Sequence, residues 1–180
     1  MTDSELKTIA AKILQKEGQE LIDAADRIPE PMARVCEIIA NHPGKVVICG
    51  MGKSGLIAQK IAATLCSIGS KAVFLHAAEA VHGDLGIYAP GDPTIVISKS
   101  GATEELVRLI PILKEFNSQL IGILGNLKSP LADQMDVVLD ASVSKEADPL
   151  GIVPTSSTTL TLAIGDALAA VLMSHRGFDH

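Results

Sequence analysis

The pattern of apolar and polar positions changes near residue 45. Before it, apolar residues repeat at helical spacing over residues 4–27, and a second helical pattern over 32–40 follows Pro29 and Pro31. After it come short apolar runs: KVVIC (45–49), AVFL (72–75), TIVIS (94–98), LIGIL (120–124) and DVVLD (136–140). Because these runs are continuous rather than alternating, they predict parallel strands buried on both faces.

Helical patterns separate the apolar runs. They cover residues 54–67, 76–82 and 103–116, with a short turn near Pro130 and a last helix over 156–175. This alternation predicts an α/β fold, a doubly wound, flavodoxin-like or Rossmann-like sheet of five parallel strands. We expect one domain over 1–180, with N-terminal helices (4–41), a parallel core (45–140), and a C-terminal loop and helix (142–175). The last helix is apolar on most sides, which predicts a sandwiched position within the domain or against another subunit.

Composition narrows the classes of function. The chain has 180 residues, 47% of them hydrophobic and 20% charged, with a net charge of −6. A net negative charge, with acidic and basic residues mixed along the chain, disfavours electrostatic binding to nucleic acid or a membrane. A bound anion therefore needs a local pocket. The N-terminus lacks signal-peptide features, and the apolar stretch LTLAIGDALAAVLM looks too short to span a bilayer and contains Asp166, which predicts a cytoplasmic protein. Cys36, Cys49 and Cys66 are expected to be reduced core thiols.

Ligands of open parallel sheets bind beyond the carboxyl ends of the strands. The loops that should form a site are therefore 50–55, 76–86, 98–105, 125–129 and 142–157. The first of them, GMGKSG, runs directly into a helix, whose free N–H groups favour a phosphate or sugar oxygen. Walker A spacing is absent and the Rossmann glycine pattern is half met, which disfavours a nucleotide. Helix–strand packing is an alternative explanation of Gly50 and Gly55, but not of Lys53 and Ser54.

The loop SKSGATEE carries three hydroxyls and a glycine at the mouth of another strand. Ser98, Ser100 and Thr103 could form a small anion cup from O–H and N–H groups. The alternative is that Ser100 or Thr103 is a plain helix cap. Glu105 points about 200° around the helix from Thr103, toward another wall or subunit, which leaves Glu104 as a solvated acid.

Together, GMGKSG and SKSGATEE resemble the sugar isomerase (SIS) domain family. HAAEAVHGDLG (76–86) and KEADPLGIVPTSSTTLTLAIGDALA (145–169) resemble its arabinose 5-phosphate isomerases. This resemblance implies interconversion of D-ribulose 5-phosphate and D-arabinose 5-phosphate, on the route to the lipopolysaccharide sugar Kdo, by a homo-oligomer, a dimer or tetramer. By the same resemblance, the phosphate is bound by Gly52, Ser54, Ser98, Ser100 and Thr103. The catalytic residues are Lys53, His82, Glu105 and Glu146, and the pocket is lined by Thr155, Ser156 and Ser157.

The implied reaction explains these residue types. A base, Glu146 or Glu105 with a raised pKa, would move a carbon-bound proton through a cis-enediolate, and Lys53 or His82 would stabilise the oxyanion. No metal or organic cofactor is required. Alternatives are that Glu146 is a solvated loop acid and that His82 is structural. A zinc site with His76 and Glu79, binding inhibitory zinc, is a further alternative, but positions i and i+6 do not share a helical face.

Some positions depart from the family pattern. Lys99 stands where relatives often have a neutral residue and would add positive charge near the phosphate, and Ala102 replaces a frequent Glu or Asn. Family members continue past RGF into a His-Pro-Gly-Gly segment and CBS domains, and His175 and His180 do not match that histidine. Rival functions are a non-catalytic sugar-phosphate sensor and a 6-phospho-3-hexuloisomerase. The presence of Lys53 together with both candidate bases favours catalysis over sensing.

Overall fold

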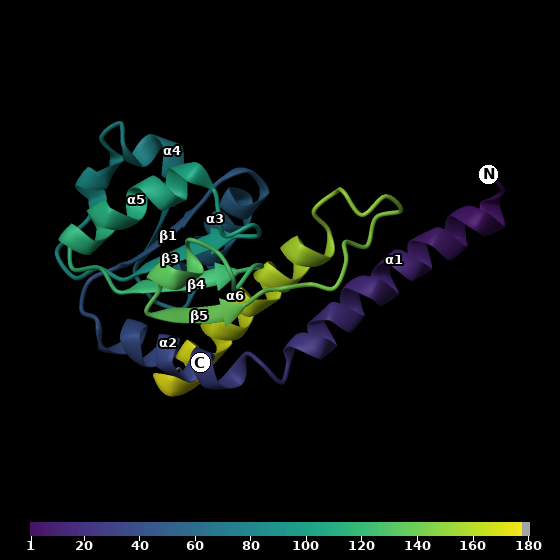
Figure 1. Cartoon of the computed structure of the whole chain (residues 1–180). Helices are drawn as coiled ribbons and strands as arrows, with labels where there is room; N and C mark the ends of the chain where they lie inside the picture. Colours follow the sequence, from purple (N-terminus) through teal and green to yellow (C-terminus); the bar gives the residue numbers. More distant parts are fainter. Residues whose placement is uncertain (178–180) are drawn as a thin grey trace.

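One sheet of five parallel strands lies between two layers of helices (Figure 1). The computed structural model describes residues 1–177, so His180 lies outside the described residues. The strands are β1 (Val46–Gly50), β2 (Ala72–His76), β3 (Thr94–Ser98), β4 (Leu120–Leu124) and β5 (Val137–Asp140). They are paired in parallel in the order β2-β1-β3-β4-β5, the flavodoxin-like order. The predicted fold class is confirmed.

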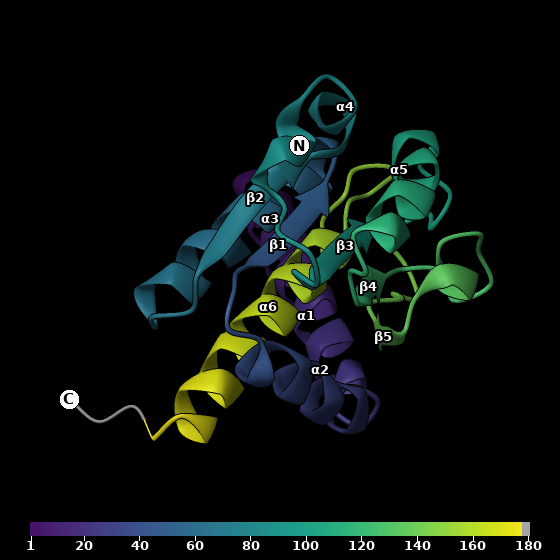
Figure 2. The ribbon, with the colours of Figure 1, turned by 90° about the vertical axis from the view of Figure 1, so that its left-hand side faces the viewer.

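Alternating side chains of the strands form two cores. One contains Ile48, Ile95 and Ile121 and is covered by α2 (Pro29–Asn41), α3 (Gly52–Ser67) and α6 (Ser156–His175). The other contains Val47 and Val96 and is covered by α4 (Ala77–Ala80) and α5 (Glu104–Glu115), with the 3-10 turns η1 (Asp84–Ile87) and η2 (Ala132–Gln134) nearby. Figure 2 shows α5 and the α2–α6 pair on opposite sides of the sheet. Burial on both faces explains the continuous Val and Ile runs.

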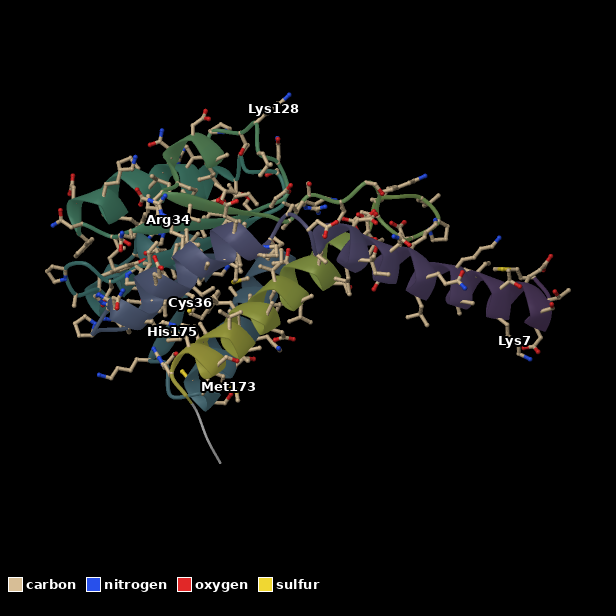
Figure 3. All side chains as sticks on the ribbon, turned by 90° about the horizontal axis from the view of Figure 1, so that it is seen from below. Lys7, Arg34, Cys36, Lys128, Met173 and His175 are labelled. Atoms are coloured by element: carbon tan, nitrogen blue, oxygen red, sulfur yellow. The ribbon has the colours of Figure 1, made fainter. Side chains whose placement is uncertain are left out.

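Helix α1 (Asp3–Ala24) extends away from this core as an arm (Figure 1). A capping box of Thr2 and Glu5 begins the helix, and only Glu20 and Ala24, near its other end, are buried. Lys7 lies toward the free end of the arm (Figure 3). Most of α1 therefore has no cover from the rest of the described chain.

Helix α6 is long and apolar enough to cross a membrane by length and composition. The argument that its apolar stretch is too short for a span is therefore wrong. Nine of its 20 residues are nevertheless buried against α1, α2 and α3, which gives its apolar composition a place in the core. The predicted sandwiched position is found within the domain.

Three local predictions need correction. Helix α2 begins at Pro29 rather than residue 32, because a proline in the first helical turn loses no hydrogen bond. The helix predicted over 76–82 is only the four-residue α4, which ends before Gly83, a glycine with φ of 125°. Cys66 is exposed, whereas Cys36 and Cys49 are buried and burial raises the pKa of Cys49 to about 12.

Candidate active site

Four of the five loops predicted to bind a ligand meet at the carboxyl edge of the sheet. They line two adjoining cavities. The hydroxyl cavity, of about 330 Å³, is lined by Ser54, Ser98, Lys99, Ser100 and Thr103. The lysine cavity, of about 210 Å³, is lined by Lys53, Ser54, Lys99, Gly125, Pro154 and Ser157 among others. Loop 76–86 lines neither cavity. The topology thus joins two motifs that lie far apart in the sequence.

In the first loop, the glycines that pack and the residues that line a cavity are different ones. A Cβ on Gly55 would lie 3.2 Å from the Gly50 carbonyl oxygen, a tight contact, so the close approach of α3 to β1 favours glycine there. Lys53 and Ser54 in contrast line the lysine cavity from the first turn of α3. Gly52 begins this helix with φ of 54°. Helix–strand packing therefore accounts for Gly50 and Gly55, and the binding role of Lys53 and Ser54 stays a prediction.

In the second loop, Ser98 and Gly101 build the turn. Ser98 is buried, and its Oγ accepts a hydrogen bond from the Gly101 N–H at 3.0 Å. Gly101 has φ of 66°, and a Cβ there would lie 2.0 Å from Ser129 Oγ, so glycine is required. Ser98 therefore shapes the loop more than it faces solvent, although it was predicted to hold the phosphate directly.

The other two hydroxyl residues of the loop also line the hydroxyl cavity. Ser100 is exposed, and its Oγ accepts the Ala102 N–H at 3.2 Å. Thr103 occupies the N-cap position of α5, yet its hydroxyl lies 3.0 Å from Ser98 Oγ and makes no capping bond. The plain-cap explanation of Thr103 is therefore wrong. Within the described chain, the first turn of α5 has no side-chain cap, which leaves its N–H groups available to an anion.

Glu146 is a buried carboxylate that five donors hold. Its exposed fraction is 3%, and Lys99 Nζ lies 2.5 Å from its Oε1. The Ser157 hydroxyl also donates to Oε1, while the Thr155 N–H, the Thr155 hydroxyl and the Ser157 N–H donate to Oε2. Burial acts to raise the pKa of Glu146, but the bonds from Lys99, Ser157 and Thr155 outweigh it and lower the pKa to about 2.

This arrangement contradicts two expectations for Glu146. It is not a solvated loop acid, and in this state its pKa is lowered rather than raised. The carboxylate also accepts from the N-terminus of α6 through the Ser157 N–H, where a negative charge is favourable. Ser156 is buried beside it, and its hydroxyl has no partner among the described atoms. The predicted pocket-lining residues at the start of α6 thus include two that hold Glu146.

Glu146 lines neither cavity but is bonded to Lys99 and Ser157, which do, whereas two other catalytic candidates have no such contact in the described chain. Glu105 is exposed on α5 and lines neither cavity, and Glu104 forms an exposed ion pair with Arg108, as a solvated acid would. His82 is exposed just after α4. Across residues 1–177, no three His, Cys, Asp or Glu side chains form a group that could hold a metal ion. The structure therefore brings Lys53 and Glu146 to the site but not Glu105 or His82.

Sequence reasoning missed one acid that positions the site. Glu20 of α1 is buried, and its carboxylate accepts the Ser144 N–H at 3.0 Å, the Ser144 hydroxyl and the Lys145 N–H. These bonds fix the chain directly before Glu146. Glu20 looked like an ordinary polar position of an amphipathic helix, and only the fold brings it to a loop 124 residues away.

A larger groove of about 840 Å³ lies elsewhere, between α5 and residues 127–134. Its walls include Ile110, Pro111 and Leu127, and none of the candidate residues lines it. The two smaller cavities are therefore the better candidate site.

Similarity to known proteins agrees with this geometry. Residues 38–171 match the model of the SIS domain. The chain belongs to the SIS domain family. This SIS domain is 49% identical to arabinose 5-phosphate isomerase KdsD of Pseudomonas aeruginosa over 87% of the chain and 49% of that relative. It is 43% identical to arabinose 5-phosphate isomerase KpsF of Escherichia coli over 98% of the chain and 56% of that protein.

The SIS domain spans about half the length of the curated relatives it matches. Among solved structures, it is similar to Escherichia coli CFT073 c3406 in complex with arabinose 5-phosphate, with a TM-score of 0.95 and 37% identity over 100% of this chain and 96% of that one.

Proposed function

We propose that this SIS domain is an aldose–ketose isomerase that interconverts D-ribulose 5-phosphate and D-arabinose 5-phosphate. The observation that carries the proposal is the hydroxyl cavity beside a cavity lined by Lys53, with the buried Glu146 bonded to Lys99 and Ser157 of the cavity walls. Relatives named arabinose 5-phosphate isomerase and the related complex with arabinose 5-phosphate support this substrate. The reaction requires no metal or organic cofactor.

In this proposal the phosphate binds in the hydroxyl cavity. Ser100 and Thr103 donate hydroxyl hydrogen bonds, and the first turns of α3 and α5 supply N–H groups with a favourable dipole. Lys99 provides the positive charge. The sugar chain then extends past Ser54, which both cavities share, into the lysine cavity.

The chemical step moves one proton between neighbouring carbons. Glu146 takes a proton from C1 of the ketose and a cis-enediolate forms; the proton returns to C2, while the O1 hydroxyl proton passes to O2 and C1 becomes the aldehyde. The Lys53 ammonium stabilises the oxyanion. Glu105 and His82 lie outside the cavities, so we assign them a role only where a second subunit brings them to a site.

We also propose a homo-oligomer, a dimer or tetramer, that acts in the cytoplasm and supplies a Kdo precursor. The arm of α1 exposes Leu6, Ile9 and Leu14, of which Leu14 is 73% exposed. An apolar groove of about 450 Å³ lies between α1, α2 and α6. A second copy that supplies such an arm would cover both surfaces. Light scattering after gel filtration should show at least two chains per particle.

The test is conversion followed by phosphorus NMR. Purified protein with ribulose 5-phosphate should produce arabinose 5-phosphate, and the reverse reaction should reach the same equilibrium. A parallel sample with 3-hexulose 6-phosphate examines the rival isomerase activity. Binding without conversion of either substrate would support the sensor instead and refute the enzyme.

A further inference from the structure

Lys99 connects the two cavities. It lies in the loop SKSGATEE, between Ser98 and Ser100, and it lines both the hydroxyl cavity and the lysine cavity. Its ammonium, however, is bonded to Glu146 Oε1 at 2.5 Å. Lys99 thus lies in the loop that forms the hydroxyl cavity, while its ammonium is bonded to the Glu146 carboxylate.

The two partners of this ion pair differ in freedom. The Glu146 side chain is 3% exposed and is held by the backbone and by hydroxyls, whereas the Lys99 side chain is 51% exposed. A lysine has a flexible stem and three donors, so it can exchange partners at low cost. Within the described part of the chain, Lys99 is the only cation paired with Glu146.

An arriving phosphate competes for this cation. A sugar phosphate near neutral pH carries about −1.5 to −2 charges, more than one carboxylate. Of the residues that line the hydroxyl cavity, Lys99 is the only one with a positive charge. A phosphate dianion in the hydroxyl cavity therefore competes with Glu146 for the ammonium.

We propose that Lys99 is a substrate-responsive positioning residue. It neutralises Glu146 in the empty site and turns to the phosphate when a sugar phosphate binds, which frees Glu146 Oε1 to accept the carbon-bound proton. This inference rests on the proposed function and adds an order to it, with phosphate binding before proton transfer. A sugar without a phosphate would leave the base neutralised.

The surroundings of Glu146 favour such a change. Burial acts to raise its pKa, and among the groups that oppose burial and lower the pKa, Lys99 has the largest effect. Departure of Lys99 therefore raises the pKa toward the range that suits a general base. Charged groups on the surrounding elements include Lys53 in the lysine cavity, Lys145 and Asp148 in the same loop, and Glu17 and Glu20 of α1, whose carboxylates bind Thr159 and Ser144.

The experiment follows the Glu146 carboxyl directly. Carbon-13 NMR of protein labelled at glutamate Cδ gives its titration, with the signal assigned by loss in Glu146→Gln, and inorganic phosphate serves as the probe. In the wild type we expect phosphate to raise the titration midpoint of Glu146 by about one pH unit or more. In Lys99→Met the midpoint should already be high without phosphate, and phosphate affinity should fall about tenfold.

Two variants separate charge from structure. Lys99→Arg keeps the charge and should recover most of the phosphate affinity and of the response. Lys128→Met removes an exposed lysine of a neighbouring loop, which points away from the molecule (Figure 3), and should behave as the wild type.

Each outcome decides between the proposals. If phosphate binds the wild type but leaves the Glu146 midpoint unchanged, or binds Lys99→Met as tightly as Lys128→Met, the positioning role is refuted and the isomerase proposal stands. If neither phosphate nor arabinose 5-phosphate binds the wild type, both proposals fail.

Discussion

Ser100 is the hydroxyl of its loop that stays open to solvent, since Ser98 and Thr103 are paired with each other. Ser100→Ala should therefore raise KM for ribulose 5-phosphate about five- to tenfold, the loss of one hydrogen bond, and change kcat less than about twofold. Steady-state kinetics measures both. Ser174→Ala, an exposed serine near the end of α6, is the matched control and should change neither. A fall in kcat without a rise in KM would contradict a binding role.

Glu146 should affect turnover rather than binding. Glu146→Gln removes the proposed base but keeps the shape of the side chain, so kcat should fall about 100-fold or more with KM within about threefold. The control is Glu104→Gln, which removes an exposed acid of α5 and should keep full activity. The assignment of Glu146 as base would be refuted by a variant that retains a tenth or more of wild-type turnover.

At the scale of single residues, the sequence predicted which residues lie near the site better than it predicted their protonation and bonding. Lys53, Ser100 and Glu146 lie at or beside the cavities, as their position in strand-end loops predicts. The low pKa of Glu146 could not be predicted, because it depends on Lys99, 47 residues away in sequence. The local sequence pattern does not indicate such a distant partner. The sequence therefore predicted for Lys99 only an added positive charge near the phosphate.

The loop over residues 142–155 depends on helix α1 for its position. Glu20→Ala should free the Ser144 and Lys145 amides, which the Glu20 carboxylate holds. We expect hydrogen exchange at these amides to rise about tenfold or more and the free energy of unfolding to fall by about 1 to 3 kcal/mol. Gln15→Ala truncates an exposed side chain of the same helix and should leave exchange in the loop unchanged. Unaltered protection in Glu20→Ala would show that α1 does not fix the loop.

At the scale of elements, the prediction succeeded where burial dictates the pattern. All five strands are found within one residue of the predicted bounds, because strands covered on both faces need unbroken apolar runs. The helix predicted after β2 was wrong, because Gly83 and Gly86 divide this segment into a four-residue helix and a 3-10 turn. Helix periodicity over so few residues carries little information.

Another buried acid, Asp92, lies at the edge of the sheet opposite the cavities. Asp92 accepts hydrogen bonds from His42, from the Lys45 side chain and N–H, and from the Ala89 N–H. Burial acts to raise its pKa, but these bonds lower it from 3.8 to about 2. Asp92 thereby joins the end of α2, the start of β1 and the turn before β3.

The sign of this shift predicts how stability depends on pH. An acid with a lower pKa in the folded state stabilises the fold fully above its unfolded pKa and loses that effect as pH falls toward the folded value. Asp92 and Glu146 should both lose it between about pH 4 and about pH 2. In urea unfolding at pH 7, Asp92→Asn should be less stable by about 2 to 4 kcal/mol and should lose less stability on acidification. The exposed Asp26→Asn is the control, and an acid dependence identical to wild type in Asp92→Asn would exclude this role.

The central claim for the whole molecule is proton transfer between C1 and C2 of a five-carbon sugar phosphate. The most direct measurement incubates the protein with ribulose 5-phosphate in deuterated water and follows the sugar by NMR. We predict that arabinose 5-phosphate appears with deuterium at C2, because a base that exchanges with solvent returns the proton. If no arabinose 5-phosphate forms, and therefore no C2-deuterated aldose is seen, the claim is contradicted.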